Sequence, residues 1–276
     1  MENTLILVVE ELSVNELKTN KRVLDNLTFQ VERNEFLGIL APSGSGKTTL
    51  LKTIMRICPK SLHSSGLITY FPDTKNKIVI QEKTNVYSSA VLSRELTYIP
   101  QNASEAFDPI EKMGVQLKET LTENRFSVSE RTNMIQELLE SMDLPESILN
   151  KYPFQLSGGT LQRCAIGLAL ILKPKVIIAD EPTSALDTIN RKRILDSFLQ
   201  LKKRNETTLL LATHDIAIVD YLCDTALVLE AGRKIEHKKI DKMDTDSTSY
   251  LVKMRRIKNK IGSTFWRLKD GKLVSS

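Results

Sequence analysis

The sequence lacks long apolar runs. No segment approaches the roughly 18 consecutive apolar residues that indicate a membrane span. At the N-terminus a short apolar run covers residues 5–9, without the basic start and longer apolar stretch of a signal peptide. We therefore expect any membrane role to come through a partner.

Cysteine is scarce as well. The 276 residues include three cysteines, Cys58, Cys164 and Cys223, which are far apart along the chain. An odd number without close pairs argues against a disulfide framework or a metal knuckle, and reduced thiols in the cytoplasm are the simple interpretation.

The charge balance is only mildly basic, with a formal net charge of +5 and a pI of about 9.0. That excess is too small by itself to indicate nucleic-acid binding. The densest basic stretch, residues 253–260, could contact phospholipid head groups, but a solvated helix face or a loose tail is the simpler interpretation. Hydrophobic residues make up 41% and charged residues 26%, so the chain can bury a core.

Apolar strands alternate with amphipathic helices along most of the chain, which predicts an α/β fold with a parallel core sheet covered on both faces. The expected strands are 5–9, 26–31, 36–40, 176–179, 208–212 and 226–229, and the expected helices are 48–57, 127–142, 159–172 and 190–203. Ser129 is a candidate cap for the second of these helices. Between residues 61 and 96 we expect a small, mostly antiparallel sheet with strands at 69–71 and 78–80.

A phosphate-binding loop lies between the predicted strand 36–40 and the helix that follows it. The pattern is Gly-x-x-x-x-Gly-Lys-[Ser/Thr], and the residues at and just after it are Ala41, Pro42, Ser43, Gly44, Ser45, Gly46, Lys47, Thr48 and Thr49. Glycines let backbone N–H groups approach phosphate oxygens, while Lys47 reaches the β- and γ-phosphates and the Thr48 hydroxyl can bind magnesium. Ala41 stands where the pattern expects glycine, and a positive φ there would cost about 1 kcal/mol.

Two carboxylates, Asp180 and Glu181, follow the fully apolar strand 176–179. At that strand end Asp180 would hold magnesium, directly or through water, and Glu181 would polarise an attacking water as general base. His214 follows the apolar strand 208–212, at a position from which it could reach the γ-phosphate.

A Ser-Gly-Gly turn before the predicted helix 159–172 is the motif that best indicates the protein family. Alone, Ser157-Gly158-Gly159 could be a simple turn and helix cap. Together with the phosphate loop, Asp180-Glu181, residues 184–187 and His214, it resembles the ATPase subunit of ABC transporters over roughly residues 3 to 240. The implied fold is a P-loop NTPase with a parallel core sheet, a small antiparallel β subdomain and an α-helical signature subdomain at about 102–165, followed by a tail at 241–276.

The resemblance also implies roles for residues. Gln101 would join magnesium to the transport interface, and His214 would act as the switch histidine. The signature would cap ATP bound on the opposite subunit, through Leu156, Ser157, Gly158, Gly159 and Gln162. A loop that crosses the dimer would comprise Ser184, Ala185, Leu186 and Asp187. ATP would be sandwiched between two subunits, so that binding drives closure and hydrolysis releases it.

Three segments resemble one subfamily of ABC transporter ATPases in particular. Residues 101–109, 152–155 and 178–187 look like those of the oligopeptide, dipeptide and nickel importers. Such importers imply ATP and magnesium, a second ATPase subunit of the same or a different kind, two permease subunits and an external binding protein. They also imply a position at the cytoplasmic face of the membrane, held there by the permeases.

The chain departs from this family in two places. Family members usually stack adenine on an aromatic residue near the first strand, but residues 12–17 contain none, so Leu17 offers only apolar contact. Some peptide-importing relatives carry a cysteine cluster in a C-terminal extension. No cysteine follows Cys223, so we expect no iron–sulfur centre.

Two other functions compete with import. A soluble ABC ATPase acting on nucleic acid would place long coiled coils between the P-loop and the signature. Only about 110 residues separate these motifs here, and they show no heptads. A nucleotide-binding subunit with weak hydrolysis of its own is favoured slightly by Ala41 and the missing aromatic, and disfavoured by Glu181 and His214.

Overall fold

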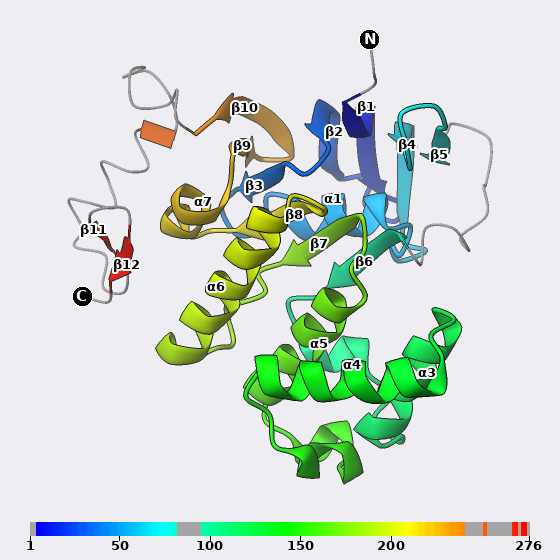
Figure 1. Ribbon diagram of the computed structural model, residues 1–276. Coiled ribbons are helices and arrows are strands. Elements are labelled where there is room, and N and C mark those ends of the chain that lie inside the picture. Colours follow the sequence, from blue (N-terminus) through cyan, green and yellow to red (C-terminus); the bar gives the residue numbers. More distant parts are fainter. Residues whose placement is uncertain (1–3, 82–94, 241–250, 253–266, 270–271, 275–276) are drawn as a thin grey trace.

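The structure, a computed structural model, describes residues 4–81, 95–240, 251–252, 267–269 and 272–274. Figure 1 shows three regions: a central sheet flanked by helices, a second sheet beside it, and a group of helices that projects from the core. The predicted α/β architecture is confirmed.

The central sheet has six strands in the order β10-β9-β3-β8-β7-β6. Neighbours from β9 to β6 are parallel, and β10 is added antiparallel at one edge. The strands are β3 (Phe36–Leu40), β6 (Leu96–Ile99), β7 (Val176–Asp180), β8 (Thr208–Thr213), β9 (Thr225–Glu230) and β10 (Arg233–Lys239). All five residues of β3 and of β7 are buried, as expected for parallel strands covered on both faces.

Helices cover both faces of this sheet. On one face, Leu50, Leu51 and Ile54 of α1 (Lys47–Ile54) pack in one cluster with the sheet residue Ile178. The other face is covered by α5 (Gly158–Ile171), α6 (Thr188–Arg204) and α7 (Ile216–Leu222), which share a second core cluster. This arrangement leaves the carboxyl ends of the parallel strands to carry a binding site.

The second sheet is antiparallel, with the order β2-β1-β4-β5, and its apolar side completes the cluster around α1. Its strands are β1 (Leu5–Glu16), β2 (Arg22–Glu32), β4 (Leu62–Tyr70) and β5 (Ile78–Gln81). The expectation of an antiparallel sheet is confirmed. The strand predicted at 5–9 is longer, because it pairs with both β2 and β4 as far as Glu16.

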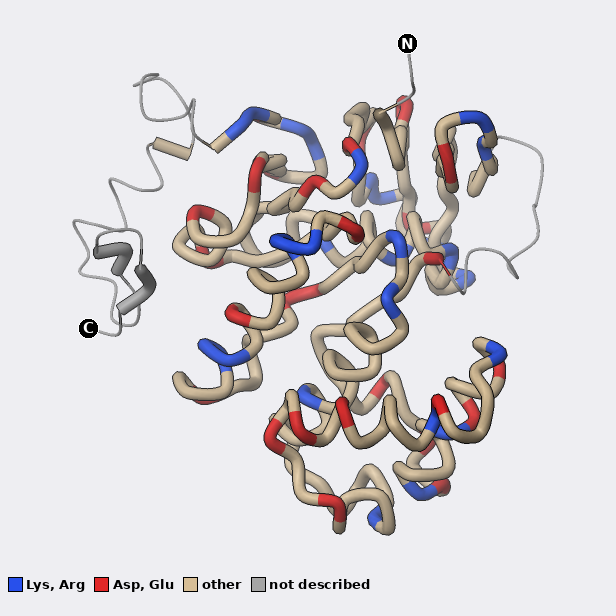
Figure 2. Tube along the Cα trace, viewed as in Figure 1, with Lys and Arg blue, Asp and Glu red and all other residues tan. Residues whose placement is uncertain are grey.

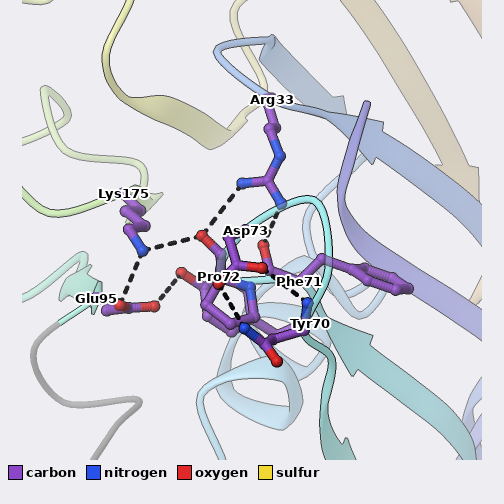
Figure 3. A network of polar contacts seen from close by, with 8 residues as sticks. Arg33, Tyr70, Phe71, Pro72, Asp73, Glu95 and Lys175 are labelled. Atoms are coloured by element: carbon purple, nitrogen blue, oxygen red, sulfur yellow. Dashed lines mark hydrogen bonds and ion pairs between the residues drawn. The ribbon is translucent and has the colours of Figure 1, made fainter. Parts of the chain in front are cut away.

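A polar network joins the two sheets (Figure 3). The Tyr70 hydroxyl donates to Glu95 Oε2 at 2.6 Å, and Lys175 Nζ donates to Glu95 Oε1 and to the Pro72 carbonyl, both at 2.9 Å. Arg33 donates to the Phe71 carbonyl at 2.7 Å. These bonds fix the end of β4 against Glu95 and Lys175, the residues immediately before β6 and β7.

The projecting helices are α3 (Met113–Glu123), α4 (Val128–Ser141) and the short η1 (Ala103–Ala106), η2 (Glu146–Asn150) and η3 (Pro153–Gln155). Ser129 was the wrong candidate for the cap of α4. Ser127 caps it, in a reciprocal box with Glu130, because the helix begins at Val128, whereas a cap at Ser129 would require it to begin two residues later.

Among the helices in the described ranges, none is both long and apolar enough to cross a bilayer. The three cysteines are free, with Cys164 and Cys223 buried. Most of the predicted tail, including the basic run 253–260, lies outside the described residues. Within it, Leu251 and Val252 are buried, and β11 (Arg267–Lys269) pairs with β12 (Lys272–Val274).

Candidate nucleotide-binding site

The phosphate loop occupies the turn between β3 and α1. Gly44 and Gly46 have φ values of 78° and 91°, a conformation that favours glycine. A Cβ at Gly46 would lie 2.5 Å from Leu24 Cδ2, so that position also has no room for a side chain. Ala41 is buried and does not have a positive φ, so alanine there carries no left-handed strain. The expected cost at this departure from the pattern is therefore absent.

Lys47 folds back over this loop. Its side chain is 7% exposed, and Nζ donates to the carbonyls of Ala41 at 2.7 Å and Pro42 at 3.4 Å. Nζ also lies 3.8 Å from Glu181 Oε1. The ammonium group thus links the phosphate loop to the end of β7, where its remaining donor capacity suits an anion.

Asp180 ends β7 and is 1% exposed. Neither of its carboxylate oxygens has a hydrogen-bond partner among the described residues. Burial raises the pKa of Asp180, and the nearby Thr48 hydroxyl acts in the opposite direction. A buried carboxylate without a donor is costly unless a cation compensates it. Asp180 and the exposed Thr48 hydroxyl therefore fit a magnesium ion, which prefers oxygen ligands.

Glu181 and His214 meet beside this carboxylate. The register of β7 against β8 pairs Asp180 with Ala212, and Glu181 N donates to the Ala212 carbonyl at 2.9 Å. Glu181 Oε1 lies 3.1 Å from His214 Nδ1, and His214 is 64% exposed. A carboxylate held between an ammonium and an imidazole at a strand end is placed to accept a proton from a water molecule.

A small recess of about 30 Å³ opens next to this pair. Glu181, His214, Arg191 and Thr213 contribute to its wall. Its size suits a single water molecule, which needs about 10–15 Å³. Sequence reasoning missed Arg191 and Thr213. The available signal was position, since Thr213 precedes His214 and Arg191 lies one helical turn after Asp187.

The predicted signature turn is exposed at the start of α5. Ser157 caps this helix by accepting from Thr160 N at 3.2 Å, and Gly158 is exposed beside it while Leu156 is half-buried. Within the described residues, no hydrogen bond joins this turn to the phosphate loop of the same chain. An exposed serine with two glycines at a helix N-terminus is open to an anion brought by another molecule.

Gln162 does not share that exposure. It is 1% exposed, and its Nε2 donates to the Pro100 carbonyl at 3.2 Å. The side chain therefore points into the protein, toward the strand end that precedes the exposed Gln101. The structure separates Gln162 from the surface formed by Ser157, Gly158 and Gly159, although all four were predicted as one group.

Residues 184–187 run directly from Glu181 to α6. Ser184 Oγ donates to the Glu181 carbonyl at 3.0 Å, and Asp187 caps α6 by accepting from Asn190 N at 2.9 Å. These hydrogen bonds from Asn190 lower the pKa of Asp187. A Cβ at Gly159 would lie 3.6 Å from the Ala185 carbonyl and equally close to Leu186 Cδ2, so the loop touches the signature turn.

The exposed end of β1 carries no aromatic side chain. Leu17, which follows the strand, is 61% exposed and is held through its N–H, which donates to the Ser61 carbonyl at 2.9 Å. This segment can offer adenine apolar contact but no ring to stack on.

Comparison with known proteins identifies relatives of this chain. The profile of the ABC transporter family matches residues 24–184. The sequence is 34% identical over 235 residues to the metal-staphylopine import system ATP-binding protein CntD of Staphylococcus aureus strain Mu50, covering 84% of this chain and 85% of that protein. It is 34% identical to the dipeptide transport ATP-binding protein DppD of Caldanaerobacter subterraneus, covering 78% and 66%, and 32% identical to the oligopeptide transport ATP-binding protein OppD of Lactococcus lactis, covering 88% and 72%.

Solved structures agree on the fold. The dimeric bacterial ABC transporter cassette MJ0796 superposes with a TM-score of 0.71 at 25% identity, covering 85% of this chain and 99% of that one. A post-hydrolysis dimer of the same cassette, bound to ADP and Pi, superposes with a TM-score of 0.72 at 24% identity.

Proposed function

The chain belongs to the ABC transporter family as an ATP-binding and ATP-hydrolysing subunit, and we propose that it energises the import of a peptide or a metal chelate through partner permeases. The observation that carries the proposal is the match to importer subunits over most of the chain, 84% in the case of CntD. In that role the protein is peripheral, held at the cytoplasmic face of the membrane by the permeases.

The site residues have distinct parts in hydrolysis. Backbone N–H groups of the phosphate loop and Lys47 would bind the β- and γ-phosphates, and Thr48, Asp180 and Gln101 would hold magnesium. Magnesium, when bound, supplies positive charge at the phosphates. Glu181 accepts the proton of the attacking water, and His214, on the same Oε1, holds that carboxylate and reaches the γ-phosphate.

A second ATPase subunit completes this site. The exposed turn at Ser157 has no bond to its own phosphate loop in the described chain, and a dimer would bring it to the nucleotide of the mate. The loop 184–187 touches both Glu181 and the signature turn, which supports its placement at the dimer interface. The relative MJ0796 is itself dimeric.

For the cargo we favour a metal chelate over a peptide. The match spans 85% of the metal-staphylopine relative, against 66% and 72% of the two peptide relatives. The test is co-expression with the candidate permeases and external binding protein, followed by co-purification. The complex in vesicles is then supplied with a nickel–histidine chelate or a pentapeptide. ATP-dependent uptake of the nickel chelate is expected. Recovery of the chain without permeases, as a lone monomer, would contradict the importer role.

The competing functions have less support. The relatives are importer subunits, and the nucleic-acid alternative is not supported. In Figure 2, Lys and Arg are interspersed with Asp and Glu along the described chain, and Arg233 of the basic strand β10 pairs with Asp25. One of the two arguments for a subunit with weak hydrolysis does not hold, because Ala41 carries no backbone strain.

A further inference from the structure

Asp180 has more acceptor capacity than one metal ion uses. A carboxylate offers about four lone-pair sites, and a single magnesium ligation occupies one of them. Both oxygens of Asp180 are buried and lack partners in the described chain. Because a buried acceptor without a donor is costly, the remaining sites call for a protein donor nearby.

Tyr98 of β6 is placed to be that donor. Tyr98 pairs with Ile178 on the adjacent parallel strand β7, and Asp180 lies two residues further along. Side chains alternate along strands, so Tyr98, Ile178 and Asp180 share the face of the sheet that α1 covers. Such diagonal neighbours, about 7–8 Å apart at the backbone, are within reach of an aromatic side chain.

The Tyr98 hydroxyl is itself unsatisfied. It is buried and, like Asp180, has no hydrogen-bond partner among the described residues. Burial first, and then the neighbouring charge of Asp180, raise the pKa of the Tyr98 phenol. A tyrosine phenol with its ordinary pKa of about 10 is protonated at neutral pH and can donate. The other nearby carboxylate, Glu105, is exposed and lies 3.4 Å from Lys52 Nζ, so it already has a cationic partner.

We propose that Tyr98 is a positioning residue for the magnesium site, whose hydroxyl donates a hydrogen bond to the Asp180 carboxylate. This bond would hold the carboxylate so that its free lone pairs remain available to a magnesium ion that Thr48 also binds. The inference rests on the proposed binding of magnesium and ATP at this site. Outer donors of this kind typically change metal affinity by about 10- to 100-fold when removed.

The test uses the full chain with Glu181→Gln, so that ATP is not consumed, and Mn²⁺ as a spectroscopic substitute for magnesium. Mn²⁺ is titrated in the presence of saturating ATP and followed by electron paramagnetic resonance. Adding Tyr98→Phe is expected to weaken Mn²⁺ binding about tenfold, while ATP affinity measured in EDTA is unchanged. Tyr98→Met, which also lacks the hydroxyl, repeats the test if the phenylalanine variant misfolds.

The matched control is Tyr70→Phe, which removes the other buried tyrosine hydroxyl of this region, bonded to Glu95. It should leave Mn²⁺ affinity at the parent value. Equal affinity in the Tyr98 variants and the parent overturns the inference, and so does an equal loss in the Tyr70 control. A parent protein that binds no Mn²⁺ with ATP refutes the proposed function itself, and that outcome is distinguishable from the other two.

Discussion

Replacing Glu181 with glutamine tests the central chemical assignment. The substitution keeps the size of the side chain and removes its charge. In the structure that charge lies 3.8 Å from Lys47 Nζ and 3.1 Å from His214 Nδ1. The backbone bond from Glu181 N to Ala212 is unaffected, so the strand end should keep its shape.

The expected loss follows from the role of a general base. Positioned proton transfer typically contributes about 10²- to 10⁴-fold in rate, or about 3–5 kcal/mol of barrier. ATP affinity should be retained or increase, because the Glu181 carboxylate no longer competes with the phosphates for Lys47. A large fall in kcat without weaker binding separates a base from a binding group.

The assay measures phosphate release at saturating ATP, with nucleotide affinity measured in parallel by a fluorescent ATP analogue. The control is Glu206→Gln, the same chemical change at an exposed position in the connection between α6 and β8. Turnover within twofold of the parent protein in Glu181→Gln would remove Glu181 as the base.

Four further substitutions probe other parts of the argument. Lys47→Ala removes the buried ammonium of the phosphate loop, and nucleotide affinity measured by calorimetry should fall at least about tenfold, since a charged hydrogen bond contributes about 1.5–3 kcal/mol. Leu17→Tyr supplies the missing ring, and ATP affinity should rise about 2- to 10-fold from a stacking gain of about 0.5–1.5 kcal/mol; unchanged affinity would place adenine elsewhere. Tyr70→Phe breaks the bond to Glu95 and should lower the free energy of unfolding in urea by about 1–3 kcal/mol. Ser157→Ala should lower the free energy of unfolding by about 1 kcal/mol through the lost cap of α5. It should also weaken ATP-dependent dimerisation measured by light scattering. If Ser157 is only a structural cap, the stability will fall and dimerisation will not change.

Much of the core sheet could be predicted from hydrophobic patterning. Runs such as 176–179 and 209–212 are apolar at every position because both faces of β7 and β8 are buried. β6 was missed, since Leu96–Ile99 includes the polar Thr97 and is only half-buried at Thr97 and Tyr98. The length of β1 was also missed, because its second half is polar and is held in the sheet by backbone pairing with β2 and β4.

The residues of the proposed site could be named from the sequence, but their contacts could not. Glycine and lysine at fixed spacing predict a phosphate loop, since only certain residue types suit that backbone. The direction of Gln162 could not be read from the motif. It depends on which face of α5 meets the core, and that face places Gln162 Nε2 on the Pro100 carbonyl. The recess beside Glu181 likewise depends on α6 bringing Arg191 toward β8.

The backbone conformation of Glu181 bears on the direction of its side chain. Its φ is 43°, in the left-handed region that side chains larger than glycine rarely adopt outside turns. Ten other described non-glycine residues also have a positive φ: the asparagines Asn20, Asn26, Asn34 and Asn205, which tolerate this region, and Glu11, Arg56, Arg125, Asp143, Lys173 and Ala231. Strain of this kind costs about 1–3 kcal/mol and persists only where the surroundings impose it. At Glu181 the constraint is the bond to Ala212, and its effect is to direct the carboxylate at both Lys47 and His214.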